Sequence, residues 1–325
     1  MGEGLALVTA FFFSVSAICV AKGQRHMTTS KGLFITLVTN LAISALILLA
    51  RTAFDGTKLS FDGVSLIFFV LAGIFTGYLG RLFNFSSIER LGTSRVSILK
   101  LLSPLFTCFI AVLFLRESLQ LVDAIASALI LAGLLAIQLT GSKRAKREIA
   151  AGKMETEQEQ EQEQEQVQQT GRIRLKRIQW LNLGLIFGIC SAFSYAIGNT
   201  LRKTALTGWP DPFVGAFIGA VIGVLAFLVG SLFEPTKTND YWKAFREPGS
   251  GYFYLSGVMT ICAHMSLLGA YTLTSLSIAT LLSFVEPIFT IPLSYVFLRG
   301  RESINLGIIV GTVIVLTGVT ILTLL

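Results

Sequence analysis

Residues 104–116 read PLFTCFIAVLFLR, and residues 287–299 read PIFTIPLSYVFLR. The second copy lies 183 residues after the first, and each copy sits in a long apolar run. Such a duplication indicates a chain built from two related halves. The positions that match are Pro104/Pro287, Phe106/Phe289, Thr107/Thr290, Phe114/Phe297, Leu115/Leu298 and Arg116/Arg299.

The apolar content places these halves in a membrane. Hydrophobic residues make up 53% of the 325 residues, and the mean hydropathy is +0.71, more than a water-soluble domain buries. A membrane-spanning helix needs about 20 mostly apolar residues, and lipid admits only helices or closed barrels. Ten apolar runs fit helices: 4–21, 33–50, 63–82, 95–115, 119–140, 181–199, 213–233, 252–271, 277–298 and 304–325.

The number of spans sets the relation between the halves. Five spans per half is odd, so two homologous halves in sequence must be inverted relative to each other. We therefore predict an all-α integral membrane protein with ten transmembrane helices in two inverted five-helix repeats, a plan typical of secondary transporters. The repeats are expected at 1–140 and 181–325. A polar linker, 141–180, with basic ends and a Glu/Gln-rich middle, joins them as a solvated tether that is helical in part.

The net charge of +7 reflects where basic residues lie rather than nucleic-acid binding. Connections after odd-numbered spans carry 21 of the 26 Lys and Arg residues, and those after even-numbered spans carry 5. Because cytoplasmic loops hold the excess of basic residues, we expect the odd connections in the cytoplasm and both termini outside.

The four cysteines lie in four different spans and form no C-x-x-C pair. They are expected to be packing residues. The chain shows no metal-ligand spacing and no nucleophile–base constellation, so we expect no metal, no cofactor and no catalytic residue.

The repeated phrase also resembles the EamA-type branch of the drug/metabolite transporter superfamily. The resemblance rests on Pro104, Glu117 and Gly133 in the first half, and on matching positions in the second half, and it covers the chain except the linker. The second-half matches are Glu286-Pro287, Glu302 and Gly318. Arg116 departs from the Gly that usually precedes the Glu. The resemblance implies transport of a small metabolite, and most characterised relatives are described with both termini cytoplasmic, against the charge count.

Charged groups inside spans are costly, so each one needs an explanation. Arg81 and Lys100 lie within the third and fourth predicted spans. Arg81 is expected either to line a substrate site or to reach the cytoplasmic phosphates, whereas Lys100 lies deeper and is expected to line the site. Asn84 adds a polar group nearby.

The second half replaces Lys100 by Ser283 and Ser103 by Glu286. Glu286 could carry a proton, pair with a basic residue or act only in helix packing. His264 is either a satisfied buried histidine or a participant in proton coupling. The predicted substrate-binding residues are Arg81, Asn84, Lys100, Ser103, His264 and Glu286.

Three prolines, Pro104, Pro287 and Pro292, are expected to kink their helices, because each removes one backbone hydrogen bond. Asn199 and Arg202 are expected at the membrane interface.

These features predict a secondary transporter in the cytoplasmic membrane that works by alternating access. Its substrate is expected to be an amino-acid-like or organic-anion solute, with export as the direction and protons as a candidate coupling ion. The alternatives are an uptake permease for a charged metabolite and, less favoured, a channel or structural membrane subunit. The partners are the substrate and the lipid bilayer, with no nucleic acid, and the protein is a monomer or homodimer.

Overall fold

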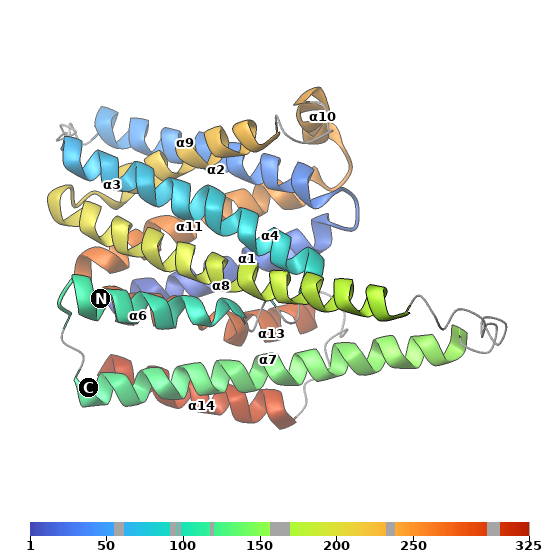
Figure 1. Cartoon of the computed structure of the whole chain (residues 1–325). Helices are drawn as coiled ribbons and strands as arrows, with labels where there is room; N and C mark the ends of the chain where they lie inside the picture. Colours follow the sequence, from blue (N-terminus) through green and yellow to red (C-terminus); the bar gives the residue numbers. More distant parts are fainter. Residues whose placement is uncertain are drawn as a thin grey trace.

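The computed structural model describes residues 1–54, 62–91, 96, 99–117, 120–156, 170–231, 238–297 and 306–324. Within these ranges the chain is helical and contains no strand, which confirms the all-α class (Figure 1). The first half consists of α1 (Gly2–Gly23), α2 (Thr29–Phe54), α3 (Gly63–Gly73), the π-helical η1 (Ile74–Leu79), α4 (Gly80–Leu91), α6 (Leu102–Phe114) and α7 (Leu121–Thr156).

The second half repeats the order of the spans. It consists of α8 (Thr170–Gly208), α9 (Pro212–Ser231), α10 (Thr238–Lys243), the short η3 (Ala244–Arg246), α11 (Ser250–Leu273), α12 (Leu276–Ser283), α13 (Glu286–Phe297) and α14 (Leu306–Leu324). The single helix α11 stands in the place of α3, η1 and α4. The helix α10 and the turn η3 lie in the connection between α9 and α11.

The described helices account for ten spans. Eight helical stretches are long and apolar enough to cross a membrane, and the shorter Leu102–Phe114 and Ile309–Thr323 complete the set. Both termini lie on one face, here called the terminal face, and the linker leaves from the opposite face, the linker face (Figure 1). Because α1 runs from the terminal face to the linker face and its counterpart α8 runs back, the two repeats are inverted.

The linker begins and ends in helix. Helix α7 continues to Thr156 and α8 starts at Thr170, so both helices extend into the predicted linker, 141–180. Residues 157–169, which contain most of the Glu/Gln run, lie outside the described residues.

The two repeated prolines mark breaks in their spans rather than kinks in continuous helices. Leu101 forms a turn before α6, and the second-half span is interrupted between α12 and α13. Pro104 and Pro287 then stand in the first turn of the new helix, where a backbone N–H has no helical partner and proline is tolerated. Both prolines thus follow an interruption of the span, and Pro292 lies further along, within α13.

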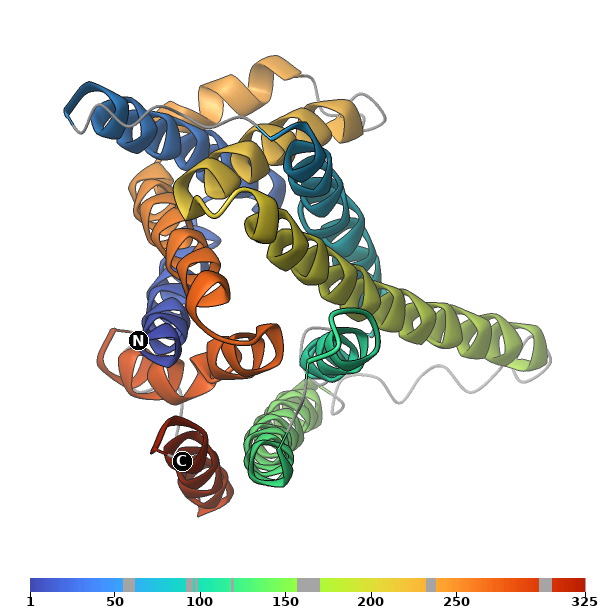
Figure 2. The same cartoon turned by 90° about the vertical axis from the view of Figure 1, so that its left-hand side faces the viewer.

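Helices α7 and α14 form a close pair at one side of the bundle (Figure 2). The matched glycines Gly133 and Gly318 face the partner helix, so a Cβ on Gly133 would lie 2.6 Å from Val315 and one on Gly318 would lie 2.8 Å from the backbone of Ala126. Small residues at these positions allow the two backbones to approach.

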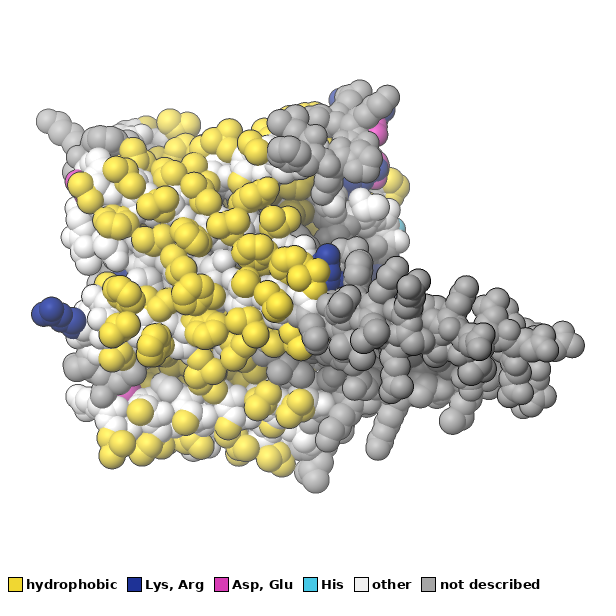
Figure 3. All heavy atoms as spheres, viewed as in Figure 1, with side chains coloured by type: hydrophobic (Ala, Val, Ile, Leu, Met, Phe, Trp, Pro, Cys, Tyr) yellow, Lys and Arg dark blue, Asp and Glu magenta, His cyan; other side chains and the backbone are white. Residues whose placement is uncertain are grey.

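An apolar surface surrounds the bundle. Large hydrophobic side chains on the outer helices are exposed, among them Leu46, Ile67, Phe109 and Ile186. Figure 3 shows hydrophobic side chains across the middle of one face, with charged side chains near the helix ends. This surface is the part of the protein that contacts lipid.

Aromatic rings cover part of the linker face and are called the aromatic cap: Phe34, Phe227, Tyr241, Trp242 and Phe245. The ring of Phe34 lies 5.3 Å from Phe227 and 5.2 Å from Trp242, measured between centroids. Phe34 and Tyr241 are each 1% exposed. Helix α10 packs on α2 and α9 at this face, because its Tyr241 contacts Phe34 of α2 and Phe227 of α9.

Glu117, which follows α6, joins the first half to the second at the terminal face. Its carboxylate accepts hydrogen bonds from the N–H groups of Leu276, at 2.6 Å, and Ser277, at 3.2 Å, and from the Ser277 hydroxyl, at 2.8 Å. A carboxylate at this position satisfies the free N–H groups at the start of α12 and interacts favourably with the helix dipole. Arg116, directly before it, has φ of 53°, a left-handed conformation that suits the glycine usual at this position.

Candidate functional site

A cavity of about 310 Å³ lies between the two halves. Its size is in the range that holds a small metabolite. Helices α1, α2, α6, α8, α9, α11, α12 and α13 and the π-helical η1 contribute to it. Its polar and charged lining residues are Asn40, Thr76, Lys100, Ser103, Tyr195, Asn199, Arg202, Thr260, His264, Ser283 and Glu286.

The cavity extends from mid-membrane toward the terminal face. In α8 its lining ends at Arg202, six residues before Gly208, and in α11 it ends at Leu268, five residues before Leu273. In α1 and α2, the lining residues nearest the linker face are Phe13 and Leu37, both well inside their helices. The described lining therefore leaves the linker-face ends of these helices, and the aromatic cap, outside the cavity.

The break before α6 contributes Lys100 and Ser103. The Lys100 side chain is exposed. Ser103 is 1% exposed, and its hydroxyl has no hydrogen-bond partner among the described residues. A buried hydroxyl without a partner costs free energy in the folded state, so its retention needs a reason.

The break between α12 and α13 contributes Ser283, Phe284 and Glu286. The Ser283 hydroxyl donates to the carbonyl of Thr280 at 2.7 Å, and the backbone carbonyl of Glu286 accepts from Ser14 at 2.8 Å. The Glu286 carboxyl interacts electrostatically with Lys100 of the other break. The two breaks thus place opposite charges at one cavity.

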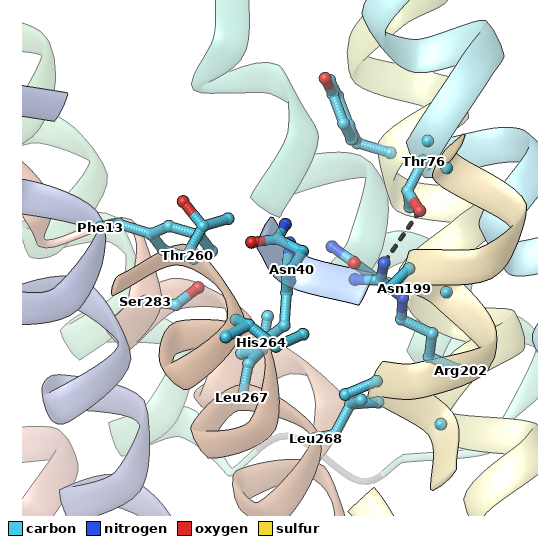
Figure 4. Close-up of a pocket in the computed structure, with 18 of the residues that line it drawn as sticks. Phe13, Asn40, Thr76, Asn199, Arg202, Thr260, His264, Leu267, Leu268 and Ser283 are labelled. Carbon is cyan, nitrogen blue, oxygen red and sulfur yellow. Dashed lines mark hydrogen bonds between the residues drawn. The ribbon is translucent and has the colours of Figure 1, made fainter. Parts of the chain in front are cut away.

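On the other side of the cavity, α8 presents a polar stripe of Tyr195, Asn199 and Arg202. The spacing of four and three residues places all three on one face of the helix. Arg202 Nη2 donates to Thr76 Oγ1 at 2.9 Å, and Thr76 Oγ1 donates in turn to the carbonyl of Ala72 at 2.7 Å (Figure 4). Thr76 belongs to the π-helical segment, a geometry often found at functional sites.

Asn40 and His264 lie between these two sides (Figure 4). The His264 ring packs edge-on against Phe13, with centroids 5.4 Å apart. With its amide nitrogen toward the carbonyls of Gly257 and Thr36, Asn40 donates to both, at 2.6 and 3.2 Å. Thr260 exchanges a hydrogen bond of 2.9 Å with Ser16. The middle of the cavity is therefore polar and held by neighbouring helices.

The fold brings together four of the residues predicted from the sequence: Lys100, Ser103, His264 and Glu286 all line the cavity. Asn84 is buried in α4 and is absent from the described lining, so the structure does not bring it to the cavity. The side chain of Arg81 lies outside the described part of the chain.

Asn199 and Arg202, which were expected at the membrane interface, line the cavity. Helix α8 continues to Gly208 instead of ending near 199, so Arg202 lies about 9 Å inside its end at 1.5 Å per residue. Asn40, Thr76 and Thr260 were not predicted. The polar stripe of α8 was the available signal, whereas single Asn and Thr residues in apolar helices carry little information in sequence.

No group of three or more metal-ligating side chains occurs among the described residues. In that part of the chain, the lining holds two cationic side chains, Lys100 and Arg202, and one carboxylate, Glu286. The arrangement suits binding of a polar or charged organic molecule.

Comparison with known proteins gives the family. The sequence model of the EamA-like transporter family matches residues 1–139 and 182–324, one segment in each half. The chain belongs to the EamA-like transporter family. As a member, it is a multi-pass membrane protein that transports small solutes, and its family is non-enzymatic.

A solved structure titled "Crystal structure of protein" has a similar fold, with a TM-score of 0.69 and 14% identity. The match covers 99% of this chain and 96% of that chain, and it concerns the fold alone. No curated protein matches the chain.

Proposed function

We propose that this EamA-family protein is a secondary transporter of the cytoplasmic membrane that moves an amino-acid-like or organic-anion solute. The observation that supports this most directly is the pair of helix breaks, which place Lys100 and Glu286 at one cavity between the inverted halves. Interrupted helices at mid-membrane are a common way to build a substrate site in transporters.

The charges of the cavity support a charged substrate. Moving a Lys, Arg or Glu side chain into the membrane interior is expensive, so such groups occur mainly where they pair or contact an ion or substrate. Lys100 and Arg202 would attract a carboxylate, and Glu286 could accept the amine of a zwitterion or a coupling proton.

Alternating access is supported by the difference between the two faces. The lining reaches toward the terminal face, whereas the aromatic cap packs on the linker face. With the basic connections in the cytoplasm, the terminal face is the outer one, and this conformation presents the cavity toward the outside. The opposite state would then require α10 and η3, which carry Tyr241, Trp242 and Phe245 of the aromatic cap, to separate from α2 and α9.

One chain supplies both halves of the cavity, so we propose the monomer as the transport unit, even if two copies associate in lipid. Export is the direction proposed. Uptake would use the same cavity with the opposite gradient.

The test is counterflow in sealed proteoliposomes containing the purified protein. We expect labelled solute to accumulate when unlabelled solute is inside, to saturate with concentration, and to fall in a Lys100→Ala variant that inserts normally. Flow that never saturates would indicate a pore, and undiminished flux in the variant would contradict the role of Lys100. Terminal reporter fusions test the orientation, and cytoplasmic termini would reverse it.

A further inference from the structure

We propose that Arg202, held in place by Thr76 of the π-helical segment, recognises a carboxylate group of the substrate. Arg202 would then be the residue that makes this transporter select carboxylates over their neutral amides. The inference rests on the proposed function, because it assigns a role within the same cavity.

The position of Arg202 is the first support. The residue lies inside the span and on the same face of α8 as Asn199 and Tyr195, all of which line the cavity. A guanidinium presents several N–H donors in one plane, a geometry that matches the two oxygens of a carboxylate. Asn199, one turn earlier, can add a further amide donor.

The local fold holds Arg202 against its neighbour. The hydrogen bond of 2.9 Å to Thr76 orients the guanidinium, and the π-helical turn places Thr76 opposite α8. Gly198 permits this contact, since a Cβ there would lie 2.3 Å from the Thr76 methyl group. The two helices therefore approach closely at the point where Arg202 meets Thr76.

The distribution of charge separates Arg202 from Lys100. Lys100 lies in the first break, opposite Glu286 of the second break, whereas Arg202 lies on α8. The described lining holds these two cations and one carboxylate, so its formal net charge is positive. A monocarboxylate would neutralise the lining, whereas its amide would leave the charge in place.

A reporter cysteine tests the charge without knowledge of the substrate. Gly219 lines the cavity, and a Cβ there would meet nothing within 4 Å, so Gly219→Cys places a thiol in open space. The four native cysteines are absent from the described lining, and the protein without Gly219→Cys measures their background. The measurement compares the rates at which anionic and cationic methanethiosulfonates modify the reporter.

We expect the anionic reagent to react faster in the parent. Arg202→Gln should lower the ratio of anionic to cationic rates about tenfold, because one of the two cations that line the same cavity as the reporter is removed. Lys203→Gln is the matched control: Lys203 bonds the carbonyls of Tyr271 and Thr274 instead of lining the cavity. Its ratio should change by less than about threefold. An unchanged ratio in Arg202→Gln would overturn the proposal.

Paired ligands test recognition itself. Glutamate with glutamine, and succinate with its monoamide succinamate, differ only in one carboxylate against one amide. In counterflow we expect the parent to prefer the acid of each pair, and Arg202→Gln to lose most of that preference. Thr76→Val should weaken the preference for the acid severalfold. Thr76→Ser should keep that preference, because serine retains the hydroxyl that accepts the hydrogen bond from Arg202.

The outcomes separate this inference from the proposed function. Saturable flux in the parent, with the same preference in Arg202→Gln, would refute the role of Arg202 and leave the transporter intact. Absence of saturable flux for every probe would count against the proposed function, and the reporter ratio would still decide whether Arg202 sets the charge of the cavity.

Discussion

The two helix breaks share a sequence phrase and a place in their repeats, but they differ in chemistry. In the first half Lys100 precedes the new helix and Ser103 stands beside the proline. In the second half the same positions hold Ser283 and Glu286. The helix break is repeated in both halves, whereas the charged side chain beside it is a lysine in the first copy and a glutamate in the second.

This difference separates the role of the backbone from the role of the side chains in the duplicated segment. The prolines and the interruption of the spans are properties of the repeat, so both halves keep them. The charged side chains Lys100 and Glu286 line one shared cavity. The two breaks can carry different charges only if the two copies of the repeat have diverged in sequence. A symmetric pair of breaks would offer the same group twice to an asymmetric solute.

The largest expected effect comes from removing the charge of the first break. Lys100→Ala should reduce transport about a hundredfold, because the cavity loses a cation that would attract the substrate and Glu286 loses its cationic neighbour. The matched change in the second break, Ser283→Ala, should reduce transport less than about twofold. Counterflow in proteoliposomes of equal protein content measures both. Equal losses in the two variants would contradict the asymmetry.

Exchanging the two residues sharpens the comparison. The double variant Lys100→Ser with Ser283→Lys keeps the cation but moves it three residues before Glu286. We expect it to recover part of the lost transport, to within about tenfold of the parent, because positions 283 and 286 both line the cavity at the second break. Recovery no better than that of Lys100→Ala would show that the cation is needed in the first break itself.

The next effect concerns the contact between the halves at the terminal face. Glu117→Ala should destabilise the folded protein by about 2–3 kcal/mol, because it removes three hydrogen bonds at the start of α12. Thermal unfolding in a single detergent measures the change. Asp123→Ala is the control, since Asp123 accepts one exposed hydrogen bond, from Gln120, and should cost about 0.5–1 kcal/mol. Similar losses in the two variants would refute the special role of Glu117.

A smaller effect with opposite signs is expected at the serines of the two breaks. Ser103→Ala should leave the free energy of unfolding unchanged or raise it by about 1 kcal/mol, because a buried hydroxyl without a partner is removed. Ser283→Ala should lower it by about 0.5–1 kcal/mol, because the bond to Thr280 is lost. Chemical unfolding of both variants measures the difference. A loss of stability in Ser103→Ala would mean that this hydroxyl is bonded in the membrane.

The smallest effect is expected at Arg116. Its left-handed conformation costs a residue with a Cβ roughly 1 kcal/mol, part of which glycine regains, while the greater freedom of glycine in the unfolded chain opposes the gain. Arg116→Gly should therefore raise the thermal midpoint slightly, and Arg116→Ala should not. A lower midpoint in Arg116→Gly would show that the arginine side chain itself contributes to stability.

Much of the fold could be predicted because the membrane restricts the choices. Runs of about 20 apolar residues must be helices in lipid, so the ten spans and their inversion followed from counting. The helix breaks were harder to place. Pro104 and Pro287 predict a change of helix direction, but a proline in an apolar run does not reveal whether the helix restarts before it.

The site shows a similar division. Lys100, Ser103, His264 and Glu286 stood out because polar groups are rare in spans, and all four line the cavity. Arg202 was assigned to the interface because the end of its span was placed about nine residues too early.

The duplication, the membrane class and the inverted arrangement follow from the order of residues alone, because each depends on local hydrophobicity and on the number of spans. Which polar groups meet depends on the packing of the helices. The Thr76–Arg202 bond joins residues 126 positions apart, and the partner of Glu117 lies in the other half of the chain. Such pairings depend on how tilted helices pack across the two repeats, and that packing leaves no periodic trace in a single sequence.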